Sequence, residues 1–138
     1  MNVHAYLMFS GRTEEAIAFY TTAVAAEVTC LMRFKDAPES PPPGMMPQDW
    51  GDKIMHSSFK VGETELMASD GCQSDGAAFS GISLSLGLAS AEEAEAKFAA
   101  LSDGGTVTMP LAETFFAQRF GSLTDRFGVS WLIVVPAQ

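Results

Sequence analysis

Glu14-Glu15-Ala16-Ile17-Ala18, near the start of the chain, is matched by Glu92-Glu93-Ala94-Glu95-Ala96 at an offset of 78 residues, from position 14 to position 92. A residue that suits a helix N-cap precedes each stretch, Thr13 in the first copy and Ser90 in the second. Each stretch also places two acids in the first helical turn, where the helix dipole favours negative charge. The match predicts two related helices, one in each half of the chain.

The segments around these helices repeat in the same order. A second match, of Val61-Gly62 with Phe127-Gly128, marks a hairpin turn late in each half. Both halves read βαβββ, so we expect one α+β domain over residues 1–138, made of two tandem βαβββ units at about 1–70 and 79–138 whose pairing completes the fold. In chain order the predicted elements are a strand Val3–Phe9, a helix Glu14–Ala25, strands Glu27–Phe34, Ile54–Val61, Thr64–Ala68 and Ser80–Leu88, a helix from Ser90 to about Leu101, and strands Thr106–Met109, Thr114–Leu123 and Val129–Val135.

The segment 36–52 interrupts the first unit. It holds five of the 7 prolines, which argues against both a helix and a central strand, so we predict a long loop. Loops of this length in compact domains are often functional. This one carries Met45, Met46 and Trp50, which predicts either a flexible lid or a cover for a dimer contact, and the residues leave both open.

Composition narrows the function. The net charge of −9 would repel a nucleic-acid backbone or an anionic membrane surface, so neither partner is expected. Cys30 and Cys72 are too few for a disulfide scaffold and lack metal-site spacing, which indicates reduced thiols. No apolar run reaches the roughly 18 residues of a membrane helix, and the N-terminus lacks the features of a signal peptide. We therefore predict a cytoplasmic protein.

Several motifs together resemble the vicinal oxygen chelate superfamily, which includes glyoxalase I, bleomycin-resistance proteins and extradiol dioxygenases. The opening strand and helix, Tyr6–Tyr20, and the last hairpin, Thr124–Trp131, carry the likeness. His56, Leu66–Asp70 and Glu113–Phe116 narrow it to the PhnB-like branch. The resemblance implies the glyoxalase/bleomycin resistance/dioxygenase fold, in which curved mixed sheets surround a cleft. It also implies a homodimer and a bacterial source.

The resemblance indicates where metal ligands would lie, because metal-dependent members carry His, Glu or Gln on the first and last strand of each unit. Alignment on the helices and hairpin turns puts weak or incompetent ligands at all four positions: Ala5, Leu66, Ser83 and Leu132. A slip of one residue would bring in His4 and Glu65, but strand alternation would then turn both to the other face. We therefore expect no metal and no other cofactor.

Strand alternation on this alignment also predicts the lining of the cleft. In the first unit the residues predicted to face inward are Ile54, His56, Ser58 and Lys60. In the second unit the inward residues with candidate ligand-binding roles are Phe116, Gln118, Phe120 and Leu132, while Arg119 and Trp131 turn to the helix side. Apolar walls with a few polar groups are typical of small-molecule sites.

Three residues are candidates for chemistry or direct ligand contact. An imidazole facing the cleft suits acid–base catalysis near neutral pH, but His56 could equally be a hydrogen-bonded sheet residue, since no partner for it is evident. Glu113, just before a strand, is a candidate catalytic partner of His56, or else caps a turn. Asp70 is a candidate ligand contact, or else fixes the following linker by accepting backbone N–H groups.

Three functions remain open. The first is a metal-free protein that binds a small, partly apolar molecule. The second is a metal-dependent lyase, isomerase or dioxygenase of the glyoxalase type, and the third is a metal-free enzyme that uses His56 with Glu113. A methyltransferase is not expected, because the chain lacks the glycine-rich first turn and the doubly wound α/β pattern.

Overall fold

The computed structural model describes residues 1–37, 47, 49–72 and 76–137. Contacts along the chain divide it into two compact units, residues 1–77 and 78–138, and each unit is described by itself. The predicted lid or dimer residues Met45 and Met46 fall outside the described residues.

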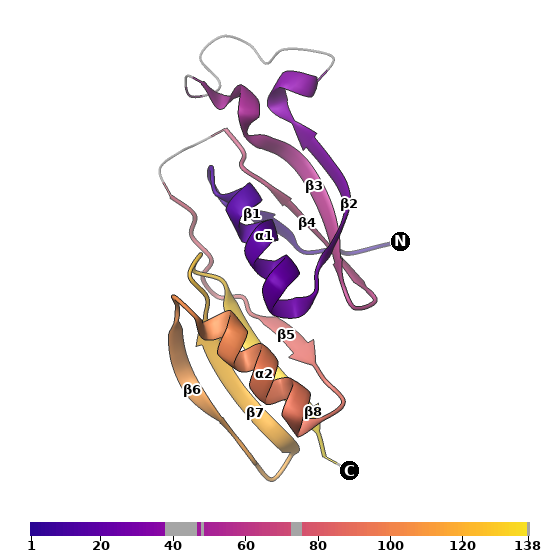
Figure 1. The fold of residues 1–138 in the computed structure, drawn as a ribbon, viewed down its shortest axis with the longest axis vertical. Helices are drawn as coiled ribbons and strands as arrows, with labels where there is room; N and C mark the ends of the chain where they lie inside the picture. Colours follow the sequence, from indigo (N-terminus) through magenta and orange to yellow (C-terminus); the bar gives the residue numbers. More distant parts are fainter. Residues whose placement is uncertain (38–46, 48, 73–75, 138) are drawn as a thin grey trace. The chain divides into compact units, whose positions relative to one another are not determined.

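Among its described residues the first unit, unit 1, has one α-helix and one four-stranded sheet (Figure 1). Its sheet has the order β1-β4-β3-β2, with β1 parallel to β4 and the other pairs antiparallel. Two short 3₁₀ helices, η1 (Phe34–Asp36) and η2 (Trp50–Asp52), flank the proline-rich segment. The main elements are β1 (Tyr6–Met8), α1 (Thr13–Val24), β2 (Glu27–Arg33), β3 (Ile54–Val61) and β4 (Thr64–Ser69).

The second unit, unit 2, repeats this plan. Its sheet has the order β5-β8-β7-β6, and the first and last strands of the unit again pair in parallel. The elements are β5 (Leu84–Gly87), α2 (Ala91–Ser102), β6 (Thr106–Ala112), β7 (Ala117–Thr124) and β8 (Ser130–Pro136). The predicted α+β fold of two βαβββ units is therefore confirmed.

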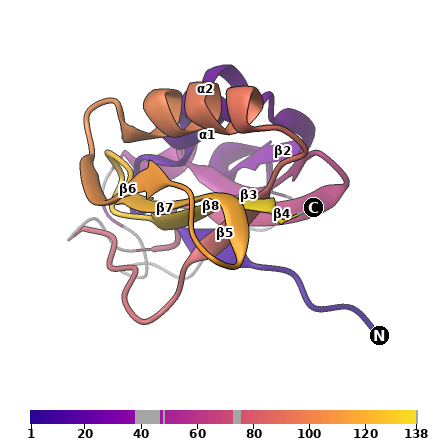
Figure 2. The ribbon, with the colours of Figure 1, turned by 90° about the horizontal axis from the view of Figure 1, so that it is seen from below.

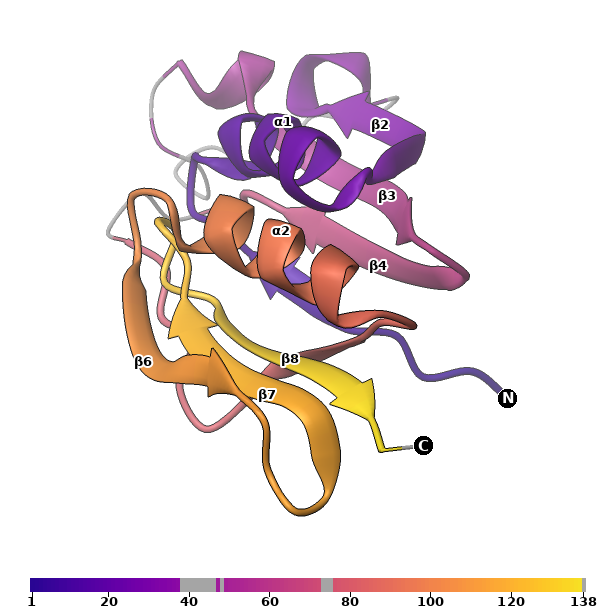
Figure 3. The same cartoon turned by 60° about the horizontal axis from the view of Figure 1, so that its bottom comes forward.

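Each helix lies on one face of its own sheet (Figure 2). In unit 1 the contact is aromatic: the ring of Tyr20 on α1 stacks on Phe59 of β3, with centroids 6.2 Å apart, and both are buried. In unit 2, α2 lies across β6, β7 and β8 (Figure 3), and the core includes the buried residues Leu101, Leu123 and Ile133. Burial of such side chains contributes about 1.5–3 kcal/mol each.

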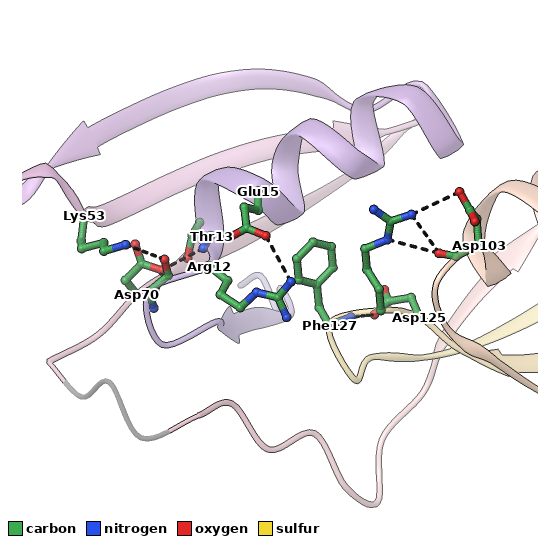
Figure 4. A network of polar contacts seen from close by, with 10 residues as sticks. Arg12, Thr13, Glu15, Lys53, Asp70, Asp103, Asp125 and Phe127 are labelled. Carbon is green, nitrogen blue, oxygen red and sulfur yellow. Dashed lines mark hydrogen bonds and ion pairs between the residues drawn. The ribbon is translucent and has the colours of Figure 1, made fainter.

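The start of α1 differs from the prediction. Thr13 is the first helical residue rather than the N-cap, and the N-cap position, Arg12, makes no side-chain capping bond. The carboxylate of Asp70, at the end of β4, accepts hydrogen bonds from the backbone N–H groups of Gly11 and Thr13, each at 2.9 Å (Figure 4). The helix is thus capped by a residue far along the chain, which a local motif could not reveal.

Other element ends shift for local reasons. The first strand shortens to β1 because the residues before it are exposed, Val3 by 94%. The seventh strand begins at Ala117 rather than Thr114, because Thr114 closes the preceding turn with Ala117 and accepts the N–H of Phe116 on its hydroxyl. The predicted N-cap Ser90 is confirmed, since its hydroxyl accepts the N–H of Glu93 at 3.2 Å.

Among the residues described, no helix combines the length and the apolar character needed to cross a membrane.

Candidate functional site

The face of the unit 1 sheet that points away from α1 carries the candidate site, and we call it the unit 1 open face. Strand register defines it: Met32 pairs with His56, Ser58 with Met67, and Tyr6 with Met67, so these side chains share one side. Phe59 and Leu66, which alternate with them, are buried toward the helix. The open face therefore includes Tyr6, Met8, Met32, His56, Ser58 and Met67.

A polar cluster lies within this largely apolar face. The hydroxyl of Tyr6 is 2.8 Å from Nδ1 of His56, and the two rings are tilted with centroids 5.6 Å apart. The hydroxyl of Ser58 is 3.4 Å from Nε2 of the same imidazole. Partial burial raises the pKa of Tyr6, an effect that outweighs the opposing hydrogen bond with Ser69. The phenol therefore stays protonated and can donate a hydrogen bond at neutral pH.

This cluster supplies the partner that the sequence did not show for His56. An imidazole held between two hydroxyls can accept a proton on one nitrogen and donate one from the other. Sequence reasoning missed Tyr6 as a site residue because its contact with His56 spans 50 residues of chain. The parallel pairing of β1 with β4 brings the two together.

The predicted face of Leu66 is wrong. Leu66 is the partner of Phe59 and is buried on the helix side, whereas Glu65, two residues before Met67, shares the open face. The alignment counted residues from the turn glycine of each unit, and equal counts lead to opposite faces of the two sheets. The reason is the pair of residues that closes each hairpin. In unit 1 this pair is Val61 with Thr64, and its side chains point to the helix side. In unit 2 the last pair, Thr124 with Ser130, points to the open side.

This correction brings Glu65 onto the open face, with the ring of His4 beside it. Nδ1 of His4 lies 3.1 Å from the backbone oxygen of Glu65. Imidazole and carboxylate are ligand types for divalent cations, but the described residues contain no group of three or more His, Cys, Asp or Glu side chains that could hold one. The absence of a metal stays a prediction.

The inward position predicted for Ile54 is also contradicted. Ile54 is only 1% exposed, so it lies in the core of unit 1. The register shift between β2 and β3 explains this, because Met32 pairs with His56 and the next residue, Arg33, pairs with Ile54. The extra residue in β3 is a bulge, and a bulge breaks the strict alternation of side chains.

The corresponding face of unit 2 agrees with the predicted alternation. On β7, Gln118, Phe120 and Ser122 are partly exposed between the buried Ala117, Gly121 and Leu123, and on β8 Leu132 is partly exposed between the buried Trp131 and Ile133. Arg119 points to the helix side, where its Nε is 3.5 Å from Glu95 of α2. The unit 2 open face thus contains Phe120, Ser122, Ser130, Leu132 and Val134, while a register shift between Ala117 and Arg119 means that alternation does not assign Gln118 to a face.

Aromatic rings extend this face toward the β6–β7 turn. Phe116 is 49% exposed and contacts Phe120 edge-on, with centroids 5.1 Å apart. Phe115, at the turn, is 98% exposed and contacts Phe116 in the same way. The amide of Gln118 donates to the backbone oxygen of Pro136 at 3.1 Å, which fixes its orientation.

The other two candidates have contrasting surroundings. Asp70 is 2% exposed, and besides Gly11 and Thr13 its carboxylate accepts the N–H of Ile54 at 2.7 Å. This is a structural role that ties together the start of α1 and the start of β3, and a ligand contact stays an untested prediction. Glu113 is exposed in the β6–β7 turn. It belongs to unit 2 and His56 to unit 1, so their predicted partnership is also untested.

Trp50, predicted as part of a lid or a dimer contact, is packed into unit 1. It is 7% exposed, and its indole N–H donates to the backbone oxygen of Gly71 at 2.7 Å. Nearby, Arg33 donates to the carboxylate of Glu14 at 2.6 Å, and this hydrogen bond is the main reason that the pKa of Glu14 is lowered. The described ends of the proline-rich segment are therefore anchored to unit 1.

Two four-stranded mixed sheets, each built from one βαβββ unit, define the glyoxalase/bleomycin resistance class of fold. A glyoxalase/bleomycin resistance protein from Albidiferax ferrireducens has this fold at 15% identity, with a TM-score of 0.62 over 99% of this chain and 99% of that chain.

The family follows from closer relatives. The model of the 3-demethylubiquinone-9 3-methyltransferase family matches residues 1–134. Protein YjdN of Escherichia coli (strain K12) is 34% identical, covering 100% of this chain and 97% of YjdN. Protein PA1353 from Pseudomonas aeruginosa is similar in structure, with 40% identity and a TM-score of 0.84 over 100% of this chain and 99% of that chain. A PhnB protein from Bacillus cereus, described as a 3-demethylubiquinone-9 3-methyltransferase, is 28% identical with a TM-score of 0.79 over 98% and 99% of the two chains. The chain therefore belongs to this family, the PhnB-like branch of the vicinal oxygen chelate superfamily.

Proposed function

We propose that this protein binds a small, partly apolar molecule against the open face of the unit 1 sheet, without a metal. The observation that carries the proposal is the Tyr6–His56–Ser58 cluster, set among the exposed side chains of Met8 and Met32. Small-molecule sites combine apolar walls with a few placed polar groups in this way. From unit 2 we propose Phe116, Gln118, Phe120 and Leu132 as ligand contacts.

The methionines offer a direct test. Met8, Met32 and Met67 lie on the unit 1 open face, whereas Met1 is fully exposed at the N-terminus and serves as an internal control. With ¹³C-methyl-labelled methionine, titration with small aromatic and aliphatic compounds should shift the three open-face signals and leave that of Met1 in place. A uniform lack of response at Met8, Met32 and Met67 across the compound set would count against the proposal.

A second candidate is a metal-free acid–base enzyme that uses His56. The observation in its favour is the 2.8 Å contact between the Tyr6 hydroxyl and Nδ1 of His56, since general bases are commonly oriented by a second group. Glu113 is the proposed second titratable group. Turnover that persists in chelator and is lost in a folded His56→Ala variant would support this candidate, whereas binding without turnover supports the first.

Measuring the metal content of the protein distinguishes the glyoxalase-type alternative from the metal-free proposal. The observation in favour of a metal-dependent lyase, isomerase or dioxygenase is that the ring of His4 contacts the backbone of Glu65 in unit 1. Elemental analysis of chelator-stripped protein, incubated with zinc, nickel, manganese or iron(II) and desalted, distinguishes the two. Near-stoichiometric retention of one metal would overturn the metal-free proposal. The methyltransferase of the family's name is not proposed, for the sequence reasons already given.

The proposal also covers the oligomeric state of the protein and its location in the cell. We infer a homodimer, because exposed apolar side chains are frequent on both sheets, Val28 and Leu31 on β2 and Val107 and Met109 on β6 among them. Sedimentation equilibrium checks this, with a mass of about twice the 14.7 kDa chain expected.

A cytoplasmic location fits the two exposed free cysteines and is checked by cell fractionation.

A further inference from the structure

His56 is held between two hydroxyl groups, and this arrangement fixes how many protons the cluster can offer to a ligand. A neutral imidazole has one N–H and one lone pair. One hydroxyl must therefore donate to the ring, and the other must accept from the ring N–H. The accepting hydroxyl keeps its own proton, which points away from the imidazole. Either tautomer thus leaves one hydroxyl with a proton that the imidazole does not take up.

Geometry favours Tyr6 as the hydroxyl that presents this donor. It does so in the tautomer with the ring proton on Nδ1, because the Tyr6 oxygen, 2.8 Å away, then accepts from the ring. Tyr6 is also 44% exposed on the open face, whereas Ser58 is 8% exposed and lies within the sheet. A ligand on the open face can therefore reach the hydroxyl proton of Tyr6 but not that of Ser58. The raised pKa of Tyr6 keeps this proton on the phenol.

The surroundings of the donor are apolar. Met8 is 49% exposed and Met32 37% exposed, and Met67 pairs directly with Tyr6 across the parallel strands. A ligand that covers these side chains removes water from the Tyr6 hydroxyl. An O–H group that loses water without gaining an acceptor pays the full cost of its desolvation. The site therefore penalises ligands that lack an acceptor atom at this point.

Charge favours a neutral acceptor over an anion. Lys60 and Glu65 pair directly across β3 and β4, so their opposite charges offset each other on this face. The chain as a whole has a net charge of −9, which disfavours anionic ligands at long range. A carbonyl oxygen next to an apolar body satisfies the donor without adding negative charge.

We propose that Tyr6, oriented by His56, is a specificity-determining residue that selects a neutral carbonyl compound with an apolar body over its carbonyl-free isostere. The inference rests on the proposed binding function and names the ligand class for the unit 1 open face. Tyr6 acts by donating one hydrogen bond to the carbonyl oxygen, and no covalent step is involved.

The test compares three probes of similar size: acetophenone, α-methylstyrene, which replaces the carbonyl oxygen with a methylene group, and benzoate, which is anionic. Each is titrated against the labelled methionine signals of Met8, Met32 and Met67. In the native protein acetophenone should bind at least about tenfold more tightly than α-methylstyrene, since a binding free energy lost with the hydrogen bond of about 1.4 kcal/mol corresponds to a factor of ten. In Tyr6→Phe the preference should fall to about one, with the fold checked by circular dichroism.

A matched control removes a hydroxyl from the other open face. The Ser83 hydroxyl contacts that of Ser130 at 2.7 Å in unit 2, so Ser83→Ala should leave the preference unchanged. A merely structural role for Tyr6 would lower the affinity for both neutral probes together and keep their ratio. The ¹⁵N shifts of His56, assigned with His4→Gln, should also change in Tyr6→Phe because the Nδ1 partner is lost.

The outcomes separate the two proposals. Equal binding of acetophenone and α-methylstyrene, with Tyr6→Phe like the native protein, would overturn this inference and leave the binding function standing. Tighter binding of benzoate than acetophenone would overturn the preference for a neutral ligand. If none of the three probes shifts an open-face methyl, the binding function fails for this chemistry, and the inference fails with it.

Discussion

Units 1 and 2 share one fold but hold their helices by different means. In unit 1 the start of α1 is capped by Asp70, which lies 57 residues after Thr13, and the helix ends on Ala25 in the left-handed conformation, with φ 56°. In unit 2 the start of α2 is capped by its own Ser90, and the chain leaves the helix through Gly104 and Gly105. The common topology therefore does not depend on a common set of terminal contacts.

The largest expected effect is the loss of the long-range cap. Asp70→Ala would leave the N–H groups of Gly11, Thr13 and Ile54 without an acceptor, two of them at buried positions. Hydrogen bonds to charged groups contribute about 1.5–3 kcal/mol each and are not additive, so we expect a loss of about 3–5 kcal/mol. Urea unfolding measures the loss. Asp70→Asn, which keeps one carbonyl oxygen, should lose markedly less, and a loss below about 1 kcal/mol in Asp70→Ala would contradict the tie between α1 and β3.

The next largest effect is expected at Gly105, where the chain leaves α2. A Cβ on Gly105 would overlap the backbone oxygen of Thr124 and approach Cα of Asp125 to 2.9 Å, and backbone cannot move aside easily. Gly105→Ala should therefore destabilise by about 3 kcal/mol, the upper range for overpacking. Thermal unfolding measures it. Gly87→Ala is the control in the same unit, because a Cβ there meets nothing within 4 Å, and equal melting temperatures of the two variants would refute the close approach.

A smaller effect separates the two caps. Ser90→Ala removes the hydroxyl that accepts the N–H of Glu93 and should cost about 1 kcal/mol, as N-cap truncations commonly do. Urea unfolding again measures it, and Ser90→Asp should retain the stability of the native protein. If Ser90→Ala cost as much as Asp70→Ala, the contrast between a local and a long-range cap would disappear.

The smallest effect has the opposite sign. Ala25 has φ 56° and ψ 40°, a conformation that costs a residue with a side chain about 1–2 kcal/mol. Ala25→Gly removes that cost but adds unfolded-chain entropy, so we expect a gain of about 0.5–1 kcal/mol. Ala18→Gly, at an exposed position inside α1, should instead lose about 1 kcal/mol. A loss in both variants would show that the left-handed end of α1 is not strained.

Features with local causes could be predicted from the sequence. The Ser90 cap depends on a contact three residues away. The Asp125 turn depends on N–H groups two and four residues ahead, those of Phe127 and Val129. The alternation along β8 and from Phe120 to Thr124 on β7 likewise depends only on strand periodicity, so Phe120 and Leu132 lie on the predicted face.

Features with distant causes could not be predicted. Thr13 has the composition of an N-cap, yet the acceptor for α1 comes from Asp70, and the Thr13 hydroxyl is buried without a hydrogen-bond partner in the described structure. Tyr6 gave no signal as a site residue because only strand pairing brings it to His56. The prediction for Leu66 was wrong because it counted residues from the turn. The pair that closes the hairpin faces the helix side in unit 1 and the open side in unit 2, so the same count gives different faces.

The two caps also imply a difference in timing during synthesis. The residues that cap α2 emerge within a single helical turn of one another, so this helix can be stabilised as soon as it leaves the ribosome. The first unit must wait, because Gly11 and Thr13 find their acceptor only after a further 59 and 57 residues have been made. Domains usually fold from the N-terminus as they emerge, and contacts distant in sequence slow that process. In this chain the earlier half has its helix capped only once β4 is complete.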